Sequence, residues 1–490
     1  MIFASKAVLH PTAPIYDTQT HELKPACVRA LRRIFDLCDE DHDQVLNDIE
    51  LNKFQTACFG SPLFPRQLRG IKDVIRRNNQ DGLTETGVTL SGFLFLHMLF
   101  IQRARSETTW AVLRAYGYGK DLRLSPERLP TLGTVLPDQS CELSEQGIAF
   151  LGKLFHKFDS DKDEALNSQE LSAFFDRAPE TLWENRKRIS STDHNGNLDR
   201  EGFIAQWVAA CYYEPSRCME HLVYLGYGGG RESSVETAIR VTPRRSLDYN
   251  RRHTSRNVFQ ILLCGSNGVD IAACARGLLP EGTQLKHLEL DGDEVVAARV
   301  PNPKALARGA GIHLLVRGVS CKRAEQIIAE NSGTDGKKGS RYVDFDVLVL
   351  LYDAADRNSF VSCAGVREQL ERTKQVVPFI FCGVQLEGST VAQQYEGSTR
   401  IDPVDYCTKS RLLPPILVEL GSSRTAYDQL YHTMAHLCFH PEEGNPLLAA
   451  QQKQTANVNK MVMYGVWGAL ALGGMAIALR RSVALRGLLH

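Results

Sequence analysis

The stretch DEDHDQVLNDIE at residues 39–50, with its counterpart DSDKDEALNSQE at residues 159–170, decides the fold of this chain. Both stretches carry carboxylates at positions 1, 3, 5 and 12, with leucine at position 8 and asparagine at position 9. Calcium takes about six to eight oxygen ligands, and a twelve-residue EF-hand loop supplies them at this spacing. Apolar residues at helical spacing flank both stretches, so the sequence predicts two helix–loop–helix calcium sites.

The predicted ligands follow from position in each loop. Side-chain oxygens come from positions 1, 3 and 5, a backbone carbonyl from position 7, and both carboxylate oxygens of a glutamate from position 12. Water is expected to bridge Asn47 and Asn167 at position 9, and the leucines at position 8 are expected to join short strands with neighbouring loops. The ligands predicted on this basis are Asp39, Asp41, Asp43, Val45 and Glu50 in the first loop, and Asp159, Asp161, Asp163, Ala165 and Glu170 in the second.

Position 6 departs from the usual loop pattern, in which it is glycine. Gln44 and Glu164 stand there instead. The sharp turn at this position needs a positive φ, which costs a residue with a Cβ roughly 1–2 kcal/mol. We therefore expect calcium affinity to be weakened, toward about the micromolar range of sensors, and not abolished.

Each calcium loop is expected to have a degenerate partner, because EF-hands fold as pairs. Residues 191–202 (STDHNGNLDREG) lie in register after the second loop but lack the first aspartate and the final glutamate. Residues 81–92 (DGLTETGVTLSG) hold the same place after the first loop and have few ligands. Each unit then ends in a Gly-Tyr-Gly triplet, at 117–119 and at 226–228. The chain is therefore predicted to contain a duplicated two-hand module.

The pattern changes to α/β beyond residue 257. Short apolar runs fit buried parallel strands, and helical stretches separate several of them. The runs are VFQILLC, IHLLVRGV, DVLVLLYD, PFIFCGVQ and PPILVEL. A first strand followed by a glycine-containing turn suggests a P-loop GTPase-like (Ras-like) domain.

The nucleotide motifs of such a domain are degenerate. A phosphate-binding loop needs G-x-x-x-x-G-K-[ST], because the lysine contacts phosphate and the hydroxyl holds Mg²⁺. Here Asp270, Ile271 and Ala272 replace the glycine, lysine and serine after Gly265 and Gly268. No D-x-x-G follows IHLLVRGV, and 382–385 (CGVQ) stands where a guanine-reading N/T-K-x-D is expected. We interpret the domain as a scaffold without catalytic residues and do not expect GTP or Mg²⁺ to bind; a GTPase with an unorthodox site is the alternative.

A hydrophobic segment lies near the end of the chain. Residues 461–479 (MVMYGVWGALALGGMAIAL) are uncharged, with Lys460 before them and Arg480 after them. A helix rises about 1.5 Å per residue, so this segment nearly crosses a hydrocarbon layer of about 30 Å. The sequence predicts a transmembrane tail anchor, inserted after synthesis, with the bulk of the chain facing the cytosol; a buried core helix is the alternative. Its glycine- and alanine-rich composition and basic tail are typical of the mitochondrial outer membrane, with the endoplasmic reticulum as the alternative.

Composition excludes several other classes. The chain is 43% apolar and 23% charged, as in ordinary folded proteins, and 57 basic residues balance 57 acidic ones. Global charge therefore indicates no nucleic-acid partner. The thirteen cysteines contain no C-x-x-C pair and are interpreted as reduced core thiols. The N-terminus has neither the apolar core of a secretory signal nor the basic residues of a mitochondrial presequence.

Together these segments resemble the mitochondrial Rho GTPases, the Miro family. The stretches KAVLHPTAPIYD, LKPACVRALRRIF, GFLFLHMLFIQRARSETTWAVLRAYGYG and the RNVF opening of the α/β region are similar to family signatures. The resemblance implies two EF-hand units, each with one calcium loop and one hidden hand, a C-terminal GTPase domain and an outer-membrane tail anchor. It also implies an N-terminal GTPase domain, which we expect to be absent because Met1 falls just before the first EF-hand unit; an upstream domain missing from the sequence is the alternative.

By resemblance, the chain is expected to be a non-enzymatic adaptor that couples cytosolic calcium to mitochondrial distribution, morphology or inheritance. Its expected partners are the membrane, motors or their adaptors, and organelle-contact proteins. Two alternatives are a functional GTPase and a constitutive tether in which calcium is only structural. The expected organisation is an N-terminal segment (1–20), two EF-hand units (21–125 and 126–228), a solvated basic connector (229–256), the GTPase-like domain (257–440), a linker (441–460), the anchor (461–479) and a basic tail (480–490).

Overall fold

The computed structural model describes most of the chain outside its two ends and several loops. The described residues are 9–129, 131–136, 138–179, 182–183, 188–230, 237–251, 253–266, 268–279, 294–301, 311–331, 345–373, 375–386, 402–420 and 425–450. Within these residues, no helix combines the length and apolar character needed to span a bilayer. The predicted anchor at 461–479 lies outside them.

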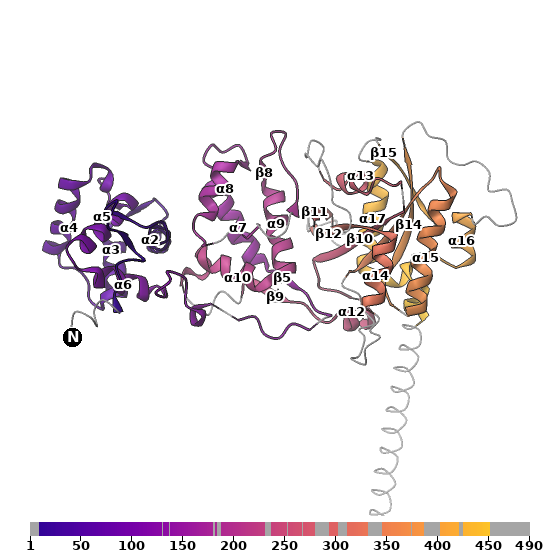
Figure 1. Cartoon of the computed structure of the whole chain (residues 1–490), viewed down its shortest axis with the longest axis horizontal. Helices are drawn as coiled ribbons and strands as arrows, with labels where there is room; N and C mark the ends of the chain where they lie inside the picture. Colours follow the sequence, from indigo (N-terminus) through magenta and orange to yellow (C-terminus); the bar gives the residue numbers. More distant parts are fainter. Residues whose placement is uncertain are drawn as a thin grey trace, which may run out of the picture. The chain divides into compact units, whose positions relative to one another are not determined.

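The chain forms two compact units, the first of which contains the described residues up to 135 and those between 140 and 242. The first half of this unit is a cluster of short helices joined by two-residue strands (Figure 1). Its elements are β1 (Tyr16–Asp17), β2 (Glu22–Leu23), α2 (Pro25–Cys38), β3 (Val45–Leu46), α3 (Asp48–Phe59), α4 (Pro65–Asn78), β4 (Val88–Thr89), α5 (Leu90–Gln102) and α6 (Ser106–Ala115).

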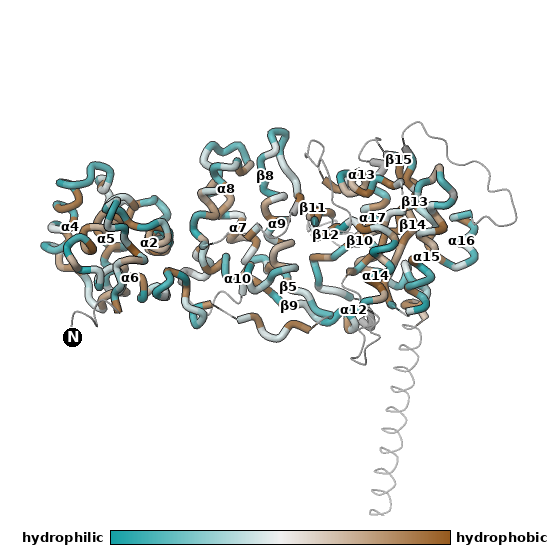
Figure 2. The backbone as a smooth tube through the Cα atoms, viewed as in Figure 1, coloured by the Kyte–Doolittle hydropathy of each residue, from teal (hydrophilic) through white to brown (hydrophobic). Residues whose placement is uncertain are grey.

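The second half of this unit repeats the pattern. Figure 2 shows hydrophilic loops beside α8 and β8, in contrast to the more hydrophobic helices below them. Phe174, Phe203 and Trp207 form the buried aromatic centre of this half. The elements are β5 (Cys141–Leu143), α7 (Glu145–Phe158), β6 (Ala165–Leu166), α8 (Ser168–Phe175), β7 (Arg188–Ile189), β8 (Leu198–Asp199), α9 (Arg200–Tyr213), α10 (Pro215–Tyr224) and β9 (Ile239–Val241).

The second unit is an α/β domain. Its strands are β10 (Val258–Gly265), β11 (Val295–Pro301), β12 (Gly311–Ser320), β13 (Val347–Asp353), β14 (Phe379–Leu386) and β15 (Ile416–Leu420). Its helices are α12 (Arg245–Arg251), α13 (Ile271–Arg276), α14 (Cys321–Asn331), α15 (Arg357–Thr373), α16 (Pro403–Lys409), α17 (Thr425–Phe439) and α18 (Pro441–Gly444). All five apolar runs quoted from the sequence form strands. The strand β11, which the sequence analysis missed, pairs with β12 in antiparallel orientation.

The strands of this domain follow the order β15-β14-β13-β10-β12-β11. The first strand, β10, lies centrally and is parallel to β12 on one side and to β13 on the other. In open α/β sheets, ligands bind beyond the carboxyl ends of the strands where the strand order reverses. The loop that follows β10, at residues 266–270, therefore lies where a nucleotide would bind in a domain of this kind.

Alternate side chains of β10 pack into two different layers. Leu262 and Cys264 belong to the core formed with α14 and α15, which lie side by side in Figure 1. Phe259 contacts Phe439 of α17, with ring centroids 5.4 Å apart. Because β10 is buried on both faces, apolar residues occupy both of its faces, and Gln260 is its one polar residue.

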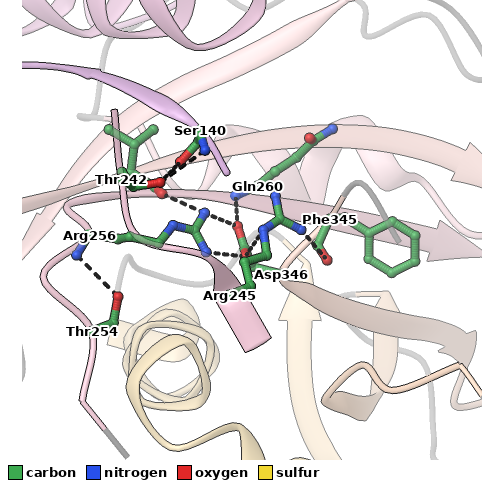
Figure 3. Close-up of polar contacts among 9 residues, drawn as sticks. Ser140, Thr242, Arg245, Thr254, Arg256, Gln260, Phe345 and Asp346 are labelled. Carbon is green, nitrogen blue, oxygen red and sulfur yellow. Dashed lines mark hydrogen bonds and ion pairs between the residues drawn. The ribbon is translucent and has the colours of Figure 1, made fainter. Parts of the chain in front are cut away.

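Part of the predicted connector at 229–256 is folded. Pro243 and the residues that follow it belong to the second unit, and Arg245 and Arg256 are buried beside the carboxylate of Asp346 (Figure 3). Two nitrogens of the Arg256 guanidinium donate to the two Asp346 oxygens at 2.6 and 2.9 Å, and the Gln260 amide donates to one of them at 2.8 Å. The arginines there were expected to be solvated; their burial follows from the presence of this carboxylate, which sequence pattern alone does not reveal.

The electrostatic balance of this cluster favours ionised Asp346. Burial alone raises the pKa of its carboxyl, but Arg245, Arg256 and the hydrogen bonds lower that pKa below its usual value. Removing one partner of such a buried pair typically costs about 3–5 kcal/mol, because the other charge is left uncompensated. The cluster therefore ties the start of the α/β domain to the strand β13 that follows Asp346.

The first residues of the predicted linker at 441–460 also pack on the α/β domain. Asn445 is buried, and its side-chain amide donates to the carbonyl of Val377 at 2.8 Å. The domain therefore extends several residues beyond the boundary expected at residue 440.

Candidate calcium sites

Each acidic loop lies between two helices and is paired with its degenerate partner through a short antiparallel ladder. In the first hand pair, Leu46 of β3 is opposite Val88 of β4. In the second, Leu166 of β6 is opposite Leu198 of β8. All four residues occupy position 8 of their loops. The structure thus contains the strand pairs expected from the leucines at position 8.

The loop carboxylates converge as the spacing predicts. Ligand oxygens of Asp39, Asp41 and Glu50 all lie within 4.8 Å of one another, and so do those of Asp159, Asp161 and Glu170. Within the described residues, these are the groups of acidic, histidine or cysteine side chains that gather closely enough to hold a metal ion. Asp39 and Glu50 are 1% and 3% exposed, so this charge is crowded and largely removed from water.

The glutamate at position 12 also begins the helix that leaves the loop. The Asn47 side chain accepts from the Glu50 amide, and the Glu50 carboxylate accepts from the Asn47 amide at 3.0 Å. The other Glu50 oxygen accepts from the Glu40 amide at 2.7 Å. Asn167 and Glu170 form the same capping box at the start of α8. Any ion that engages this glutamate therefore acts on the first turn of the outgoing helix.

The aspartates at position 1 each present a buried oxygen that the protein leaves without a hydrogen-bond partner. One oxygen of Asp39 accepts from the Gln44 amide at 3.1 Å, and one oxygen of Asp159 accepts from the Glu164 amide at 3.2 Å. The other oxygen, Oδ1, is buried in both residues and has no hydrogen-bond partner. A buried carboxylate oxygen without a partner is costly unless a cation or donor satisfies it. Hard oxygen donors in this arrangement fit calcium.

The backbone at position 6 has the conformation that the loop requires. Gln44 has φ 68° and Glu164 has φ 67°. This left-handed conformation directs each amide toward the aspartate at position 1, as the hydrogen bonds above require. The expectation of positive φ at two non-glycine residues is confirmed, together with the backbone strain that it brings.

Like charges and burial shape the protonation of these loops. Burial raises the pKa of the Asp39 carboxyl, opposed by the hydrogen bond from Gln44 and by the positive charge of Lys157. The pKa of Asp161 is also raised, by loss of solvent and by its neighbours Asp163 and Glu170. A divalent cation would relieve this repulsion, and the raised pKa values make Asp39 and Asp161 easier to protonate without one.

The remaining predicted ligands hold the loop in shape. Asp43 accepts from the Val45 amide at 2.8 Å, and Asp163 accepts from the Ala165 amide at 2.9 Å. These two aspartates lie outside the close groups described above. Val45 and Ala165 are the first residues of β3 and β6 and stay predicted carbonyl ligands.

In the degenerate hands, backbone atoms occupy the space that a ligand glutamate at position 12 would need. A Cβ on Gly92 would lie 2.1 Å from the Gly82 carbonyl oxygen, and one on Gly202 would lie 1.9 Å from that of Ser191. No side chain fits at position 12 of either loop without displacing the backbone. In the 191–202 loop, Asp193 accepts from the Asn197 amide and Asp199 from the Gly202 amide, and neither has a buried oxygen without a partner, in contrast to Asp39 and Asp159.

Arginines close to both acidic loops join the two halves of the first unit. The sequence analysis did not single out these arginines. Arg33 of α2 is buried and donates to the carbonyls of Val223 and Tyr224 at 2.9 and 3.1 Å. These carbonyls belong to the last turn of α10, and that of Val223 also accepts from the Gly226 amide at 3.0 Å. Periodicity places Arg33 on α2 but gives no sign of its distant partner.

A second set of contacts connects the helix entering the first loop to the segment after the second. Arg177, just beyond α8, pairs with Asp36 of α2 at 2.9 Å, and its guanidinium lies 4.4 Å from the ring centroid of Phe158. Arg32 of α2 pairs with Asp176 at 2.7 Å. These ion pairs connect the end of α8 to α2, and we call them the arginine clasp (Arg32, Arg177 and their aspartates).

The loop after β10 is filled by its own side chains. Ile271, which stands in place of the phosphate-binding lysine, is buried, and a Cβ on Gly265 would lie 2.4 Å from its side chain. The Asp270 carboxylate accepts from the Ala273 amide at 3.0 Å and lies 3.3 Å from the Arg276 guanidinium. The carboxylate thus caps the start of α13, the kind of place where a helix N-terminus binds phosphate.

The residues expected to replace the guanine-reading motif lie within a strand. Cys382 to Gln385 form part of β14 and are paired in register with β15. No loop that could surround a base begins at these residues, because the strand continues to Leu386.

The fold and the two acidic loops define a protein of paired EF-hand units joined to an α/β domain. Two family models described as EF hand associated match residues 61–147 and 183–253. Mitochondrial Rho GTPase 1 of Arabidopsis thaliana is 32% identical over 484 residues, which are 97% of this chain and 70% of that protein. Mitochondrial Rho GTPase 2 of the same plant is 37% identical over 356 residues, 72% of this chain and 53% of that protein. The chain belongs to the mitochondrial Rho GTPase (Miro) family, as the resemblance indicated.

Strain at position 6 leads to a first prediction. Gln44→Gly is expected to make the first hand about 1 kcal/mol more stable than Gln44→Ala, because only glycine removes the cost of positive φ. The alanine variant is the matched control, since it loses the same side chain but keeps the Cβ. Hydrogen–deuterium exchange of α2 and α3 peptides in the full chain measures the difference. Equal or faster exchange in the glycine variant would show that the turn is not strained.

Proposed function

We propose that this chain is a calcium-responsive adaptor of the Miro type, held on the mitochondrial outer membrane by its C-terminal segment. It would couple cytosolic calcium to mitochondrial distribution, morphology or inheritance through motors, their adaptors or organelle-contact proteins. The observation that carries the proposal is the buried, unpartnered Oδ1 of both Asp39 and Asp159 within converging carboxylates. The names of the two Arabidopsis relatives support the mitochondrial location.

Calcium would act first on the helices that leave the loops. Glu50 and Glu170 hold loop amides and the first turns of α3 and α8 through their capping boxes. When these carboxylates turn to bind an ion, their hydrogen bonds with the loop change and the helix starts shift. The arginine clasp carries a shift of α8 to α2, because Arg177 pairs with Asp36 near the end of α2. Binding at one loop would thereby influence the geometry of the other.

A tryptophan reports on the helix that would move. Trp183 contacts Phe175, the last residue of α8, with ring centroids 4.6 Å apart. Calcium is expected to change tryptophan emission of the full chain in detergent and to slow hydrogen exchange in α8. Glu170→Gln should abolish both effects, whereas Asp193→Asn, in the degenerate hand, should leave them intact. Magnesium alone serves as the ion control.

The alternative role of a constitutive tether gives a different outcome. A tether would bind calcium without rearrangement, so binding heat without any change in emission or exchange would contradict the sensor proposal. Loss of the response in Asp193→Asn would also contradict it, because that residue is hydrogen-bonded within its own loop.

We also infer that the α/β domain acts without nucleotide hydrolysis. Ile271 fills the position of the phosphate-binding lysine, and the Asp270 carboxylate lies at the start of α13. Two like charges about 4 Å apart repel by roughly 4 kcal/mol at an effective dielectric constant of 20, which opposes phosphate there. The domain would then serve as a scaffold between the hands and the membrane segment.

Nucleotide binding tests this inference. A fluorescent GTP analogue with Mg²⁺ is expected to give no saturable signal with the full chain, and GTP turnover should not exceed the no-protein blank. Saturable, magnesium-dependent binding that unlabelled GTP displaces would establish the alternative of a GTPase with an unorthodox site.

The membrane segment is proposed from the uncharged run at 461–479 and its flanking basic residues. Expressed in cells, the full chain is expected in the mitochondrial membrane fraction and to resist carbonate extraction. A chain ending at residue 455 should move to the soluble fraction. Carbonate-resistant membrane association of that shorter chain would contradict the anchor.

A further inference from the structure

Three cysteine thiols gather in the α/β domain, away from the calcium loops. Cys264 is the penultimate residue of β10, Cys321 is the first residue of α14, and Cys363 lies within α15. The Sγ atoms of Cys264 and Cys321 are 3.5 Å apart. Cys363 is the third cysteine of the group, and its Sγ donates to the Leu351 carbonyl at 3.2 Å.

The three thiols differ in exposure and in acidity. Cys264 and Cys363 are fully buried, whereas Cys321 is half-buried and reaches solvent. The hydrogen bond from Cys264 and the neighbouring Cys363 lower the pKa of the Cys321 thiol, opposed by its burial, whereas the contact with Cys321 and burial raise the pKa of Cys264. The start of an eleven-residue helix further favours a thiolate at Cys321. The more accessible thiol, Cys321, whose pKa is lowered, therefore lies beside a buried thiol.

A metal site fits this cluster less well than redox chemistry does. The three sulfur atoms do not form one of the close ligand groups, which among the described residues occur only at the two calcium loops. A disulfide needs only two sulfur atoms, and the pair at 3.5 Å must close to about 2.0 Å. Since β10 and β12 are already paired, with Gly265 opposite Ser320, the approach requires little movement of the strands.

We propose that Cys321 and Cys264 form a peroxide-responsive disulfide. The Cys321 thiolate attacks one oxygen of hydrogen peroxide, the O–O bond breaks, and hydroxide leaves, so that sulfur is oxidised to a sulfenic acid and peroxide is reduced. The Cys264 sulfur then attacks the Cys321 sulfur, the S–O bond breaks, and water leaves with the Cys264 proton. Overall, two thiols and one hydrogen peroxide give one disulfide and two waters.

The disulfide would fix the end of β10, which leads into the degenerate nucleotide loop, to the start of α14. Cys264 precedes Gly265, where that loop begins, and Cys321 starts the helix that follows β12. In the reducing cytosol such a bond is transient and is reversed by thiol exchange, as in redox sensors. The α/β scaffold would thus respond to peroxide independently of calcium at the hands.

Disulfide mapping of the full chain tests the proposal without a variant. The chain, purified in detergent with reduced thiols, is treated with hydrogen peroxide, its remaining thiols are alkylated, and unreduced peptides are analysed by mass spectrometry. We expect a peptide pair joined through Cys264 and Cys321, which dithiothreitol separates. Cys58 is the control, because it is the other half-buried cysteine among the described residues and burial raises the pKa of its thiol to about 12.

Reaction rates add a second readout. Cys321 should be alkylated by iodoacetamide at neutral pH at least about tenfold faster than Cys58, because the thiolate is the nucleophile. Cys321→Ser should abolish the peroxide-induced link, and Cys58→Ser should preserve it. Cys321 that reacts no faster than Cys58, or that proceeds to sulfinic acid without any link to Cys264, would overturn the proposal.

Discussion

The structure of the first unit depends on the crowding of carboxylates around a position that no protein donor fills. In each acidic loop, the aspartate at position 1 gives one oxygen to the amide at position 6 and leaves the other buried without a partner. Burial and mutual repulsion make this arrangement unfavourable for the bare protein. It persists because the helices, the strand pair and the capping boxes around it determine the loop conformation. In the proposed function, a divalent cation would supply that partner.

Elsewhere in the described residues, protein atoms fill the space that a ligand would occupy in the degenerate hands and in the nucleotide loop. The degenerate hands contribute strands β4 and β8, and glycine at position 12 lets their own backbone fill the space of an ion. In the α/β domain, Ile271 and Asp270 similarly fill the loop that would receive phosphate. The chain thus keeps the architecture of several ligand sites while leaving unsatisfied oxygens at two of them.

The sequence predicted those parts of the structure that depend on residues close together in the chain. The loops, the strand pairs at position 8, the positive φ of Gln44 and five strands of the sheet all follow from spacing and residue type. The contacts of Arg33 and Arg177, the burial of Arg245 and Arg256 beside Asp346, and the proximity of Cys264 to Cys321 join residues that are distant in sequence. Nothing in periodicity identifies such partners. The sequence shows that both degenerate loops have glycine in place of glutamate at position 12. Only the structure shows why: a backbone carbonyl lies where a side chain would begin.

The number of calcium ions bound tests the central claim most directly. Isothermal titration calorimetry of the full chain in detergent should give two ions per chain, one ion after Glu50→Gln or Glu170→Gln alone, and none after both substitutions. Calcium heat that survives the double substitution, or its absence from the unaltered chain, would contradict the assignment of the two loops.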